Sequence, residues 1–242
     1  MEKNKFTEDY YDKDYFVTTG GKKIKLADGT VKEWSYANPS GDWHGAGMVS
    51  KAWNKVFNPK KMLDVGAGRG VFIAYARKEG IEAEGFDFSH FAAGEGRFYK
   101  CKKEWMIQHD ATQRWPYSNG KFDFTVCLDL MEHIYEEDID FLINELFRVS
   151  SKYIFLQIAV PENFEYSFKK DESIPEEYKV YTLTGHVLMK KREWWFKKLE
   201  RTGWRVNQTK VDEFFNAVVP PLTEDCAWKR NLVTVIEKVC PK

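Results

Sequence analysis

The chain has 242 residues, 43% of them hydrophobic and 31% charged, which is typical of a soluble globular protein. Lys plus Arg equal Asp plus Glu at 37 each, so the balanced charge argues against a protein that binds nucleic acid mainly through phosphates. The four cysteines show neither metal-ligand spacing nor a disulfide framework, and there is no signal-peptide core and no apolar run of membrane-spanning length. These features predict a cytoplasmic protein without a membrane span and leave its oligomeric state open.

The first part of the chain differs from the rest. Residues 1–43 alternate between polar and aromatic side chains, and the segments KIKL and VKEW flank Ala27–Thr30, a turn signal that predicts a short hairpin. Residues 1–43 are therefore predicted to form an aromatic-rich lid or extension. Residues 44–242 are predicted to form the main domain.

Strands and helices alternate from residue 44 onward. Apolar runs predict strands at residues 61–66, 81–88, 104–110, 121–130, 152–160, 204–211 and 231–239. Helical spacing predicts helices at 44–57, 70–80, 89–100, 138–149 and 192–203. Alternation of this kind implies parallel strands joined by right-handed crossovers. The last two strands, expected to be joined by a loop at 212–230 without a helix, should form an antiparallel edge pair of a three-layer, seven-stranded α/β domain.

The loop after the first of these strands is rich in glycine. It reads Asp64-x-Gly66-x-Gly68-x-Gly70, and ligands of open α/β sheets bind at the carboxyl ends of the strands. A nicotinamide site would need its third glycine at position 71, which is Val71. The glycines taken alone are equally consistent with a tight turn.

Acidic residues end the next two strands. Asp87 is placed to accept both hydroxyls of a ribose, and Asp110 to reach an adenine amino group. Each could instead cap the helix that follows it. The joint occurrence of both acids with the glycine loop favours a nucleoside-containing cofactor.

Residues 61–160 resemble the core of class I S-adenosylmethionine-dependent methyltransferases, through DVGAGRG, EGFDFS and HDATQRWPYSNGKFDFTVCLDLMEHI. The resemblance implies a Rossmann-like methyltransferase fold and S-adenosylmethionine as cofactor. It also implies that the cofactor lies against the glycine loop, the acidic strand ends and the end of the fourth strand. The residues implied are Asp64, Gly66, Ala67, Gly68, Asp87, Phe88, Asp110, Ala111 and Leu128.

Two histidines are candidate catalytic residues. His133 follows the fourth strand in CLDLMEHI, and His186 precedes the helix at 192–203; either could act as a base or serve only in packing. DLMEH resembles a CMEMLEH-like stretch of quinone-biosynthesis O-methyltransferases, and some relatives bind a metal there. Asp129 is shorter than the glutamate of that pattern, so no metal is expected.

The acceptor is predicted to be a small molecule, with O-methylation favoured. Three aromatic segments could enclose it, namely the N-terminal extension, residues 161–184 and residues 212–230. Methylation of protein or RNA, a catalytically silent cofactor-binding subunit and, more distantly, a nicotinamide oxidoreductase are the alternatives. The sequence does not identify the acceptor.

Overall fold

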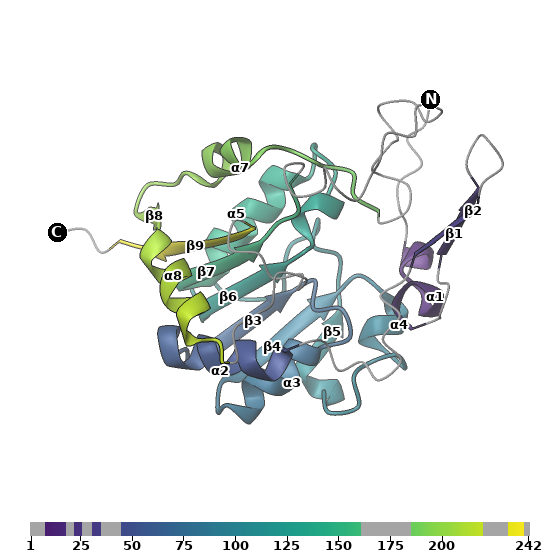
Figure 1. The fold of residues 1–242 in the computed structure, drawn as a ribbon, viewed down its shortest axis with the longest axis horizontal. Helices are drawn as coiled ribbons and strands as arrows, with labels where there is room; N and C mark the ends of the chain where they lie inside the picture. The colour runs from purple at the N-terminus through teal and green to yellow at the C-terminus, as the bar shows by residue number, and fades with distance from the viewer. Residues whose placement is uncertain are drawn as a thin grey trace.

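The structure, a computed structural model, describes residues 8–17, 22–25, 31–34, 45–160, 185–219 and 232–239. Nine strands are present in these ranges, and seven of them form one sheet in the order β5-β4-β3-β6-β7-β9-β8 (Figure 1). The strands of this sheet are β3 (Lys61–Val65), β4 (Glu82–Asp87), β5 (Met106–Gln108), β6 (Phe122–Leu128), β7 (Ser150–Gln157), β8 (Trp204–Val206) and β9 (Val233–Lys238). Strands β3 to β7 are parallel, whereas β9 runs antiparallel to both β7 and β8. The predicted seven-stranded sheet with an antiparallel edge pair is confirmed.

Strand β3 lies inside the sheet, where it pairs on one side with β4 and on the other with β6. Four of its five residues are buried, as expected for a strand covered on both faces. Asp64 lies opposite Gly85, where an added Cβ would come within 2.5 Å of the Asp64 carbonyl oxygen. A glycine at position 85 therefore leaves room for the Asp64 carbonyl oxygen, and the parallel pairing of β3 and β4 brings their carboxyl ends together.

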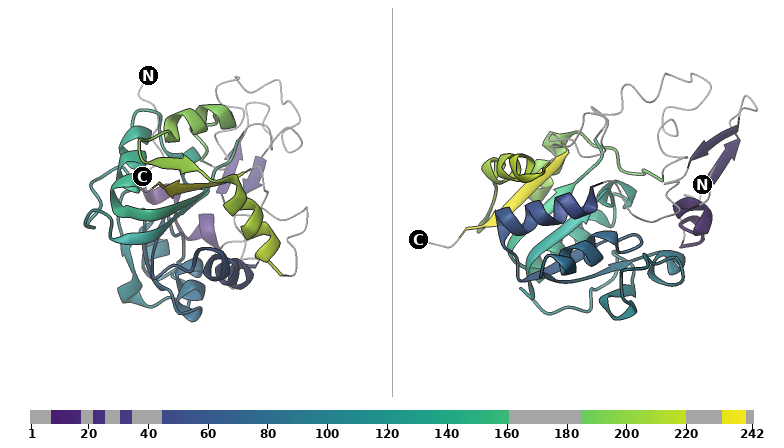
Figure 2. Two further views of the ribbon diagram at one scale, coloured as in Figure 1. Left: turned by 90° about the vertical axis from the view of Figure 1, so that its left-hand side faces the viewer. Right: turned by 60° about the horizontal axis from the view of Figure 1, so that its bottom comes forward.

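Helices cover both faces of the sheet (Figure 2). On one face, α2 (Ala46–Phe57), α3 (Val71–Lys78) and α8 (Gln208–Ala217) share a core with Phe124 and Phe155 of the strands. Trp53 of α2 is fully buried there, with ring centroids 5.7 Å from Phe124 and 5.5 Å from Phe155. On the other face, α5 (Ile139–Val149) and α7 (Arg192–Leu199) pack into a second core with Trp115. The three-layer arrangement follows from these two cores.

Short elements complete the described chain. They are the 3-10 helices η1 (Glu8–Tyr10), η2 (Lys103–Trp105) and η3 (Met131–His133), with α1 (Lys13–Phe16), α4 (His90–Ala93) and the strands β1 (Lys22–Lys25) and β2 (Val31–Trp34). The predicted hairpin is confirmed, since β1 and β2 pair antiparallel. Figure 1 shows them beside α1, at the end of the molecule opposite the C-terminus. None of the helices within the described ranges is both long and apolar enough to cross a bilayer.

One predicted connection is wrong. The segment between the last two strands contains α8, and β8 ends at Val206 instead of reaching residue 211. The Asn207 side chain caps the helix by accepting a hydrogen bond from the Lys210 amide at 3.0 Å, and Val211 and Phe214 are buried on the same helical face. The spacing of Val211 and Phe214, three positions apart, fits a helix and not the predicted strand and loop.

Candidate active site

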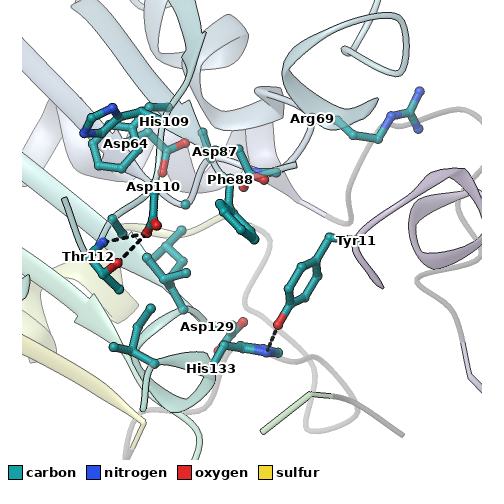
Figure 3. A pocket seen from close by; sticks show the side chains of 18 of the residues that line it. Tyr11, Asp64, Arg69, Asp87, Phe88, His109, Asp110, Thr112, Asp129 and His133 are labelled. Atoms are coloured by element: carbon teal, nitrogen blue, oxygen red, sulfur yellow. Dashed lines mark hydrogen bonds between the residues drawn. The ribbon is translucent and has the colours of Figure 1, made fainter. Parts of the chain in front are cut away.

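A cavity of about 580 Å³ opens at the carboxyl ends of β3, β4 and β6. Its walls come from the glycine loop after β3, the turns after β4 and β5, the segment after β6, and Tyr11, Tyr15 and Phe16 of the N-terminal segment. Figure 3 shows several of these side chains around the cavity. Every residue that the sequence suggested for cofactor binding lines it.

The glycine loop takes a conformation that other residues rarely adopt. Gly66, Gly68 and Gly70 have φ angles of 71°, 53° and 76°, in the left-handed region. The amides of Gly66 and Ala67 donate to the Phe86 carbonyl oxygen at 3.0 and 2.9 Å, which holds the loop against the end of β4. A Cβ at Gly66 would also lie 2.8 Å from the Leu130 side chain. Bare backbone is thus required where the loop faces the cavity.

Asp87 links the loop to the end of β4. Its Oδ2 accepts a hydrogen bond from the Gly68 amide at 2.8 Å, and its Oδ1 accepts one from the Ser89 amide at 2.8 Å. Burial raises the pKa of Asp87 to about 6, although both backbone hydrogen bonds act to lower it. The Asp87 carboxylate is therefore rigidly held at the cavity wall, and each oxygen keeps a lone pair for a further donor.

Asp64 lies at the base of the same cavity. It is 2% exposed, and its Oδ2 has no hydrogen-bond partner among the described residues. Burial, and then the nearby Asp87 charge, raise the pKa of Asp64 to about 8. A buried carboxyl of this kind is costly unless a ligand supplies a donor or a positive charge.

The remaining predicted cofactor residues surround the adjoining part of the cavity. Asp110 Oδ1 accepts hydrogen bonds from the amide and the hydroxyl of Thr112, both at 2.8 Å, so the Asp110 side chain stabilises its own loop and caps no helix. Phe88, Ala111 and Leu128 contribute apolar walls. An aromatic face beside apolar walls and polar loop atoms suits a planar ring.

Asp129 follows β6 in an unusual backbone conformation. Its φ angle is 49°, uncommon for a residue other than glycine, and its Oδ2 accepts a hydrogen bond from Gln157 Nε2 at 2.8 Å. Burial raises the pKa of Asp129 to about 6, despite the hydrogen bond from Gln157. Such local strain concentrates at functional sites.

The two candidate histidines are brought together, but only one lines the cavity. His133 faces it, and its Nδ1 lies 3.3 Å from the Tyr11 hydroxyl (Figure 3). His186 is buried behind His133, with ring centroids 4.8 Å apart and planes at 88°. Burial lowers both pKa values, that of His186 to about 4 and that of His133 well below its usual range. Both imidazoles are therefore neutral at physiological pH.

The predicted acceptor chamber is only partly observed. Tyr11, Tyr15 and Phe16 do line the cavity, whereas Phe214 of the 212–230 segment is a buried core residue whose ring lies 4.9 Å from that of Phe155. The prediction that the 212–230 segment encloses the acceptor is therefore wrong for Phe214. Residues 161–184 and 220–231 lie outside the described residues.

Several cavity residues were not singled out from the sequence. Gln157 and His109 line the cavity, as does Arg69, whose side chain points away from the other labelled residues in Figure 3. Gln157 had a detectable signal, because it is a polar residue within the apolar run of β7. His109 and Arg69 had none beyond their neighbours in the motifs.

Comparison with known proteins bears on the whole fold and on this cavity. A family model described as a methyltransferase domain matches residues 46–214, which is more than half of the chain. The chain belongs to this methyltransferase family. The matched range includes every element that lines the cavity except the N-terminal segment.

Individual relatives are more distant from this methyltransferase. The ubiquinone biosynthesis O-methyltransferase of Azoarcus sp. (strain BH72) is 28% identical over 78 residues, which cover 31% of this chain and 34% of that protein. The match thus spans about a third of the relative's length. Among solved structures, the plantazolicin methyltransferase BpumL in complex with SAH has a TM-score of 0.57 at 15% identity, covering 81% of this chain and 83% of that one. An S-adenosylmethionine-dependent methyltransferase from Archaeoglobus fulgidus has a TM-score of 0.52 at 17% identity, covering 80% and 94%.

The cavity suits S-adenosylmethionine, the cofactor that the sequence predicts for this methyltransferase. Its volume lies within the range of about 300–1,000 Å³ that small-ligand sites usually have. The unpartnered Asp64 oxygen and the fixed Asp87 carboxylate supply acceptors for a ligand rich in hydroxyl and amino donors. Gly66 keeps the wall free of a side chain where a Cβ would collide with Leu130.

Proposed function

We propose that this methyltransferase transfers the methyl group to a hydroxyl oxygen of a small organic acceptor. The observation that carries the proposal is a single cavity lined both by the residues proposed to bind the cofactor and by aromatic side chains and His133. Tyr11, Tyr15 and Phe16 cover the cavity from the N-terminal segment, and such an aromatic cover fits a compact acceptor better than a duplex. The similarity to an O-methyltransferase over 78 residues supports oxygen as the methylated atom.

The roles of the cofactor residues form part of the proposal. Asp87 would accept both ribose hydroxyls, with Phe88 against the adenine ring. Asp110 and Ala111 would address the adenine edge, and Leu128 would contact the cofactor through its backbone. Gly66, Ala67 and Gly68 would lie along the methionine part, where Asp64 would accept from the amino group. The bound cofactor supplies an activated methyl group, so the protein must mainly align the acceptor and exclude water.

The acceptor would bind between the N-terminal aromatic segment and His133. A hydroxyl there must lose its proton to become a good nucleophile, and a neutral imidazole can accept one. His133 is the candidate to receive it, because it lies on the cavity wall and burial keeps its imidazole neutral, although the same burial makes it a weaker base. His186 would hold the His133 ring in place through their edge-to-face contact.

A direct assay tests the proposal. Purified protein should first bind S-adenosylhomocysteine, measured by calorimetry, and then release this product from S-adenosylmethionine when hydroxylated small molecules are supplied. Mass spectrometry should locate the new methyl group on oxygen. Transfer to protein or RNA but to no small acceptor would contradict the proposal, and so would transfer confined to nitrogen or carbon.

A further inference from the structure

A second hollow, of about 610 Å³, lies at the edge of the sheet opposite the active site. It is bounded by the second half of α3, residues 80–82, Lys100, and Trp105 of η2 directly before β5. These segments stand at the amino ends of β4 and β5, whereas the active-site cavity opens at the carboxyl ends of the strands. We call this hollow the α3 groove. It shares no described residue with the active-site cavity, so a ligand bound there would not compete with the cofactor.

Two aromatic rings from separate segments line the α3 groove. Tyr75 belongs to α3 and Trp105 to η2, and both side chains are half-buried. Ala74 and the buried Ile81 add apolar surface to the same groove. Accessible rings beside apolar side chains are suited to stacking against a planar group.

Arg77 is held in the groove with its terminal nitrogens unused. Its Nε donates a hydrogen bond to the Ala83 carbonyl oxygen at 2.6 Å, and its guanidinium carbon lies 4.4 Å from the centre of the Trp105 ring. Within the described part of the chain, neither Nη atom has a hydrogen-bond partner and no carboxylate pairs with Arg77. A guanidinium fixed in this way presents a preorganised fork to a phosphate or a carboxylate.

Further basic side chains reach the groove from two directions. Lys78 and Lys100 line it, and the Nζ atom of Lys102 lies 5.3 Å from the centre of the Trp105 ring. A favourable interaction with the C-terminus of α3 would explain Lys78 alone. Lys100 and Lys102 belong to the chain between α4 and β5, so the end of α3 does not account for them.

Little negative charge offsets these cations. Glu82 is the one acid among the described residues that line the groove, and its carboxylate lies 3.8 Å from Lys61 Nζ. Lys78 and Lys102 form no ion pair with any carboxylate that the structure describes. The chain as a whole is neutral, so positive charge is concentrated locally at this groove and would attract an anion.

We propose that the α3 groove binds a nucleotide, with a phosphate group on the Arg77 fork and the base against Tyr75 and Trp105. The fork would accept a carboxylate as well, but only a phosphorylated planar ligand uses the cations and both rings together. The volume of the groove lies in the range of about 300–1,000 Å³ that small-ligand sites usually have. The ligand is not the methyl acceptor, because the groove lies at the opposite edge of the sheet. The same chemistry occurs in a free nucleotide and in single-stranded RNA.

The test uses the full-length protein saturated with S-adenosylhomocysteine, so that an added nucleotide cannot enter the active-site cavity. Calorimetry with ATP should show one equivalent bound, and tripolyphosphate, which lacks the base, should bind at least about threefold more weakly. Arg77→Gln should weaken ATP binding at least about tenfold, and the exposed Lys78→Glu at least about threefold. Arg201→Gln is the matched control, because its guanidinium carbon lies 5.4 Å from the centre of the Phe147 ring, outside the groove, and it should bind ATP as wild type does.

A fluorescein-labelled single-stranded RNA of about eight nucleotides, followed by anisotropy, identifies the source of the nucleotide. RNA binding at least about tenfold tighter than ATP binding, and lost in Arg77→Gln, assigns the groove to a strand, whereas equal or weaker RNA binding assigns it to a free nucleotide. The proposal is overturned if wild type binds neither ATP nor the RNA, if both groove variants bind as wild type does, or if tripolyphosphate binds as tightly as ATP. All variants should keep wild-type affinity for S-adenosylhomocysteine, which reports their folding, and a failure here leaves the proposed function untouched.

Discussion

Replacing Asp87 by Asn should weaken cofactor binding strongly while changing the stability of the ligand-free protein much less. The carboxylate accepts from the Gly68 and Ser89 amides, and an asparagine must turn its NH₂ group toward one of these donors. The substitution therefore also removes the negative charge that would accept the ribose hydroxyls. Hydrogen bonds to charged groups contribute about 1.5–3 kcal/mol each.

The expected loss in cofactor binding follows from these contacts. Loss of one to two charge-assisted hydrogen bonds amounts to about 2–4 kcal/mol, or roughly a 30- to 1,000-fold higher Kd for S-adenosylhomocysteine. The stability of the ligand-free protein should change much less. The folded-state pKa of about 6, above the usual 3.8, means that ionised Asp87 destabilises the fold above pH 6. That cost is about 3 kcal/mol, and asparagine relieves it while losing one backbone contact.

The chain offers a matched control in Asp123. Its carboxylate likewise accepts backbone hydrogen bonds, from the amides of Lys60 at 2.9 Å and Lys61 at 2.8 Å, but at the opposite end of the sheet. Calorimetry should give Asp123→Asn a wild-type Kd for S-adenosylhomocysteine, and urea unfolding should show whether either variant is destabilised. The reasoning is refuted if Asp87→Asn binds within about threefold of wild type, or if both variants lose binding equally.

Three further outcomes are expected. The affinity of the wild-type protein for S-adenosylhomocysteine, measured by calorimetry, should fall about tenfold per pH unit below pH 6, because Asp87 must be ionised to accept both hydroxyls. The affinity of Asp87→Asn should lack this pH dependence. Gly66→Ala should abolish cofactor binding, because the added Cβ would lie 2.8 Å from the Leu130 side chain. Gly80→Ala is the control, since Gly80 also has a positive φ angle (85°) but no atom near an added Cβ. This variant should bind the cofactor normally and lose only about 1–2 kcal/mol of stability in urea unfolding. Glu145→Gln should lower the free energy of unfolding by about 3–5 kcal/mol, because this buried carboxylate accepts hydrogen bonds from two arginines and a backbone amide. The pKa of Glu145 is lowered in the folded protein, so the stability that the carboxylate contributes is lost as the pH falls. In urea titrations the difference between wild type and Glu145→Gln should therefore shrink below about pH 4.5.

The part of the cavity proposed to bind the cofactor could be predicted from the sequence because its signals are local. A buried strand, a glycine loop and an acid at the next strand end each follow from a few neighbouring residues, and the parallel sheet then brings the strand ends together. Asp64, Asp87 and Asp110 lie at one cavity for this reason. The antiparallel edge pair was predicted correctly but from a wrong premise, because the connection between its two strands contains α8.

The acceptor end depended on contacts between distant segments. Tyr11 and His133 are 122 positions apart in the chain, and no local pattern pairs them. Likewise, η3 and the segment before α7 are joined by hydrogen bonds from the amides of Val187 and Leu188 to the Glu132 carbonyl oxygen. The sequence alone thus predicted the fold class and, through the family resemblance, the cofactor. Only tertiary packing decided that Glu132, His133 and His186 form one cluster, because side-chain neighbours from separate segments are set by how the layers pack and not by spacing along the chain.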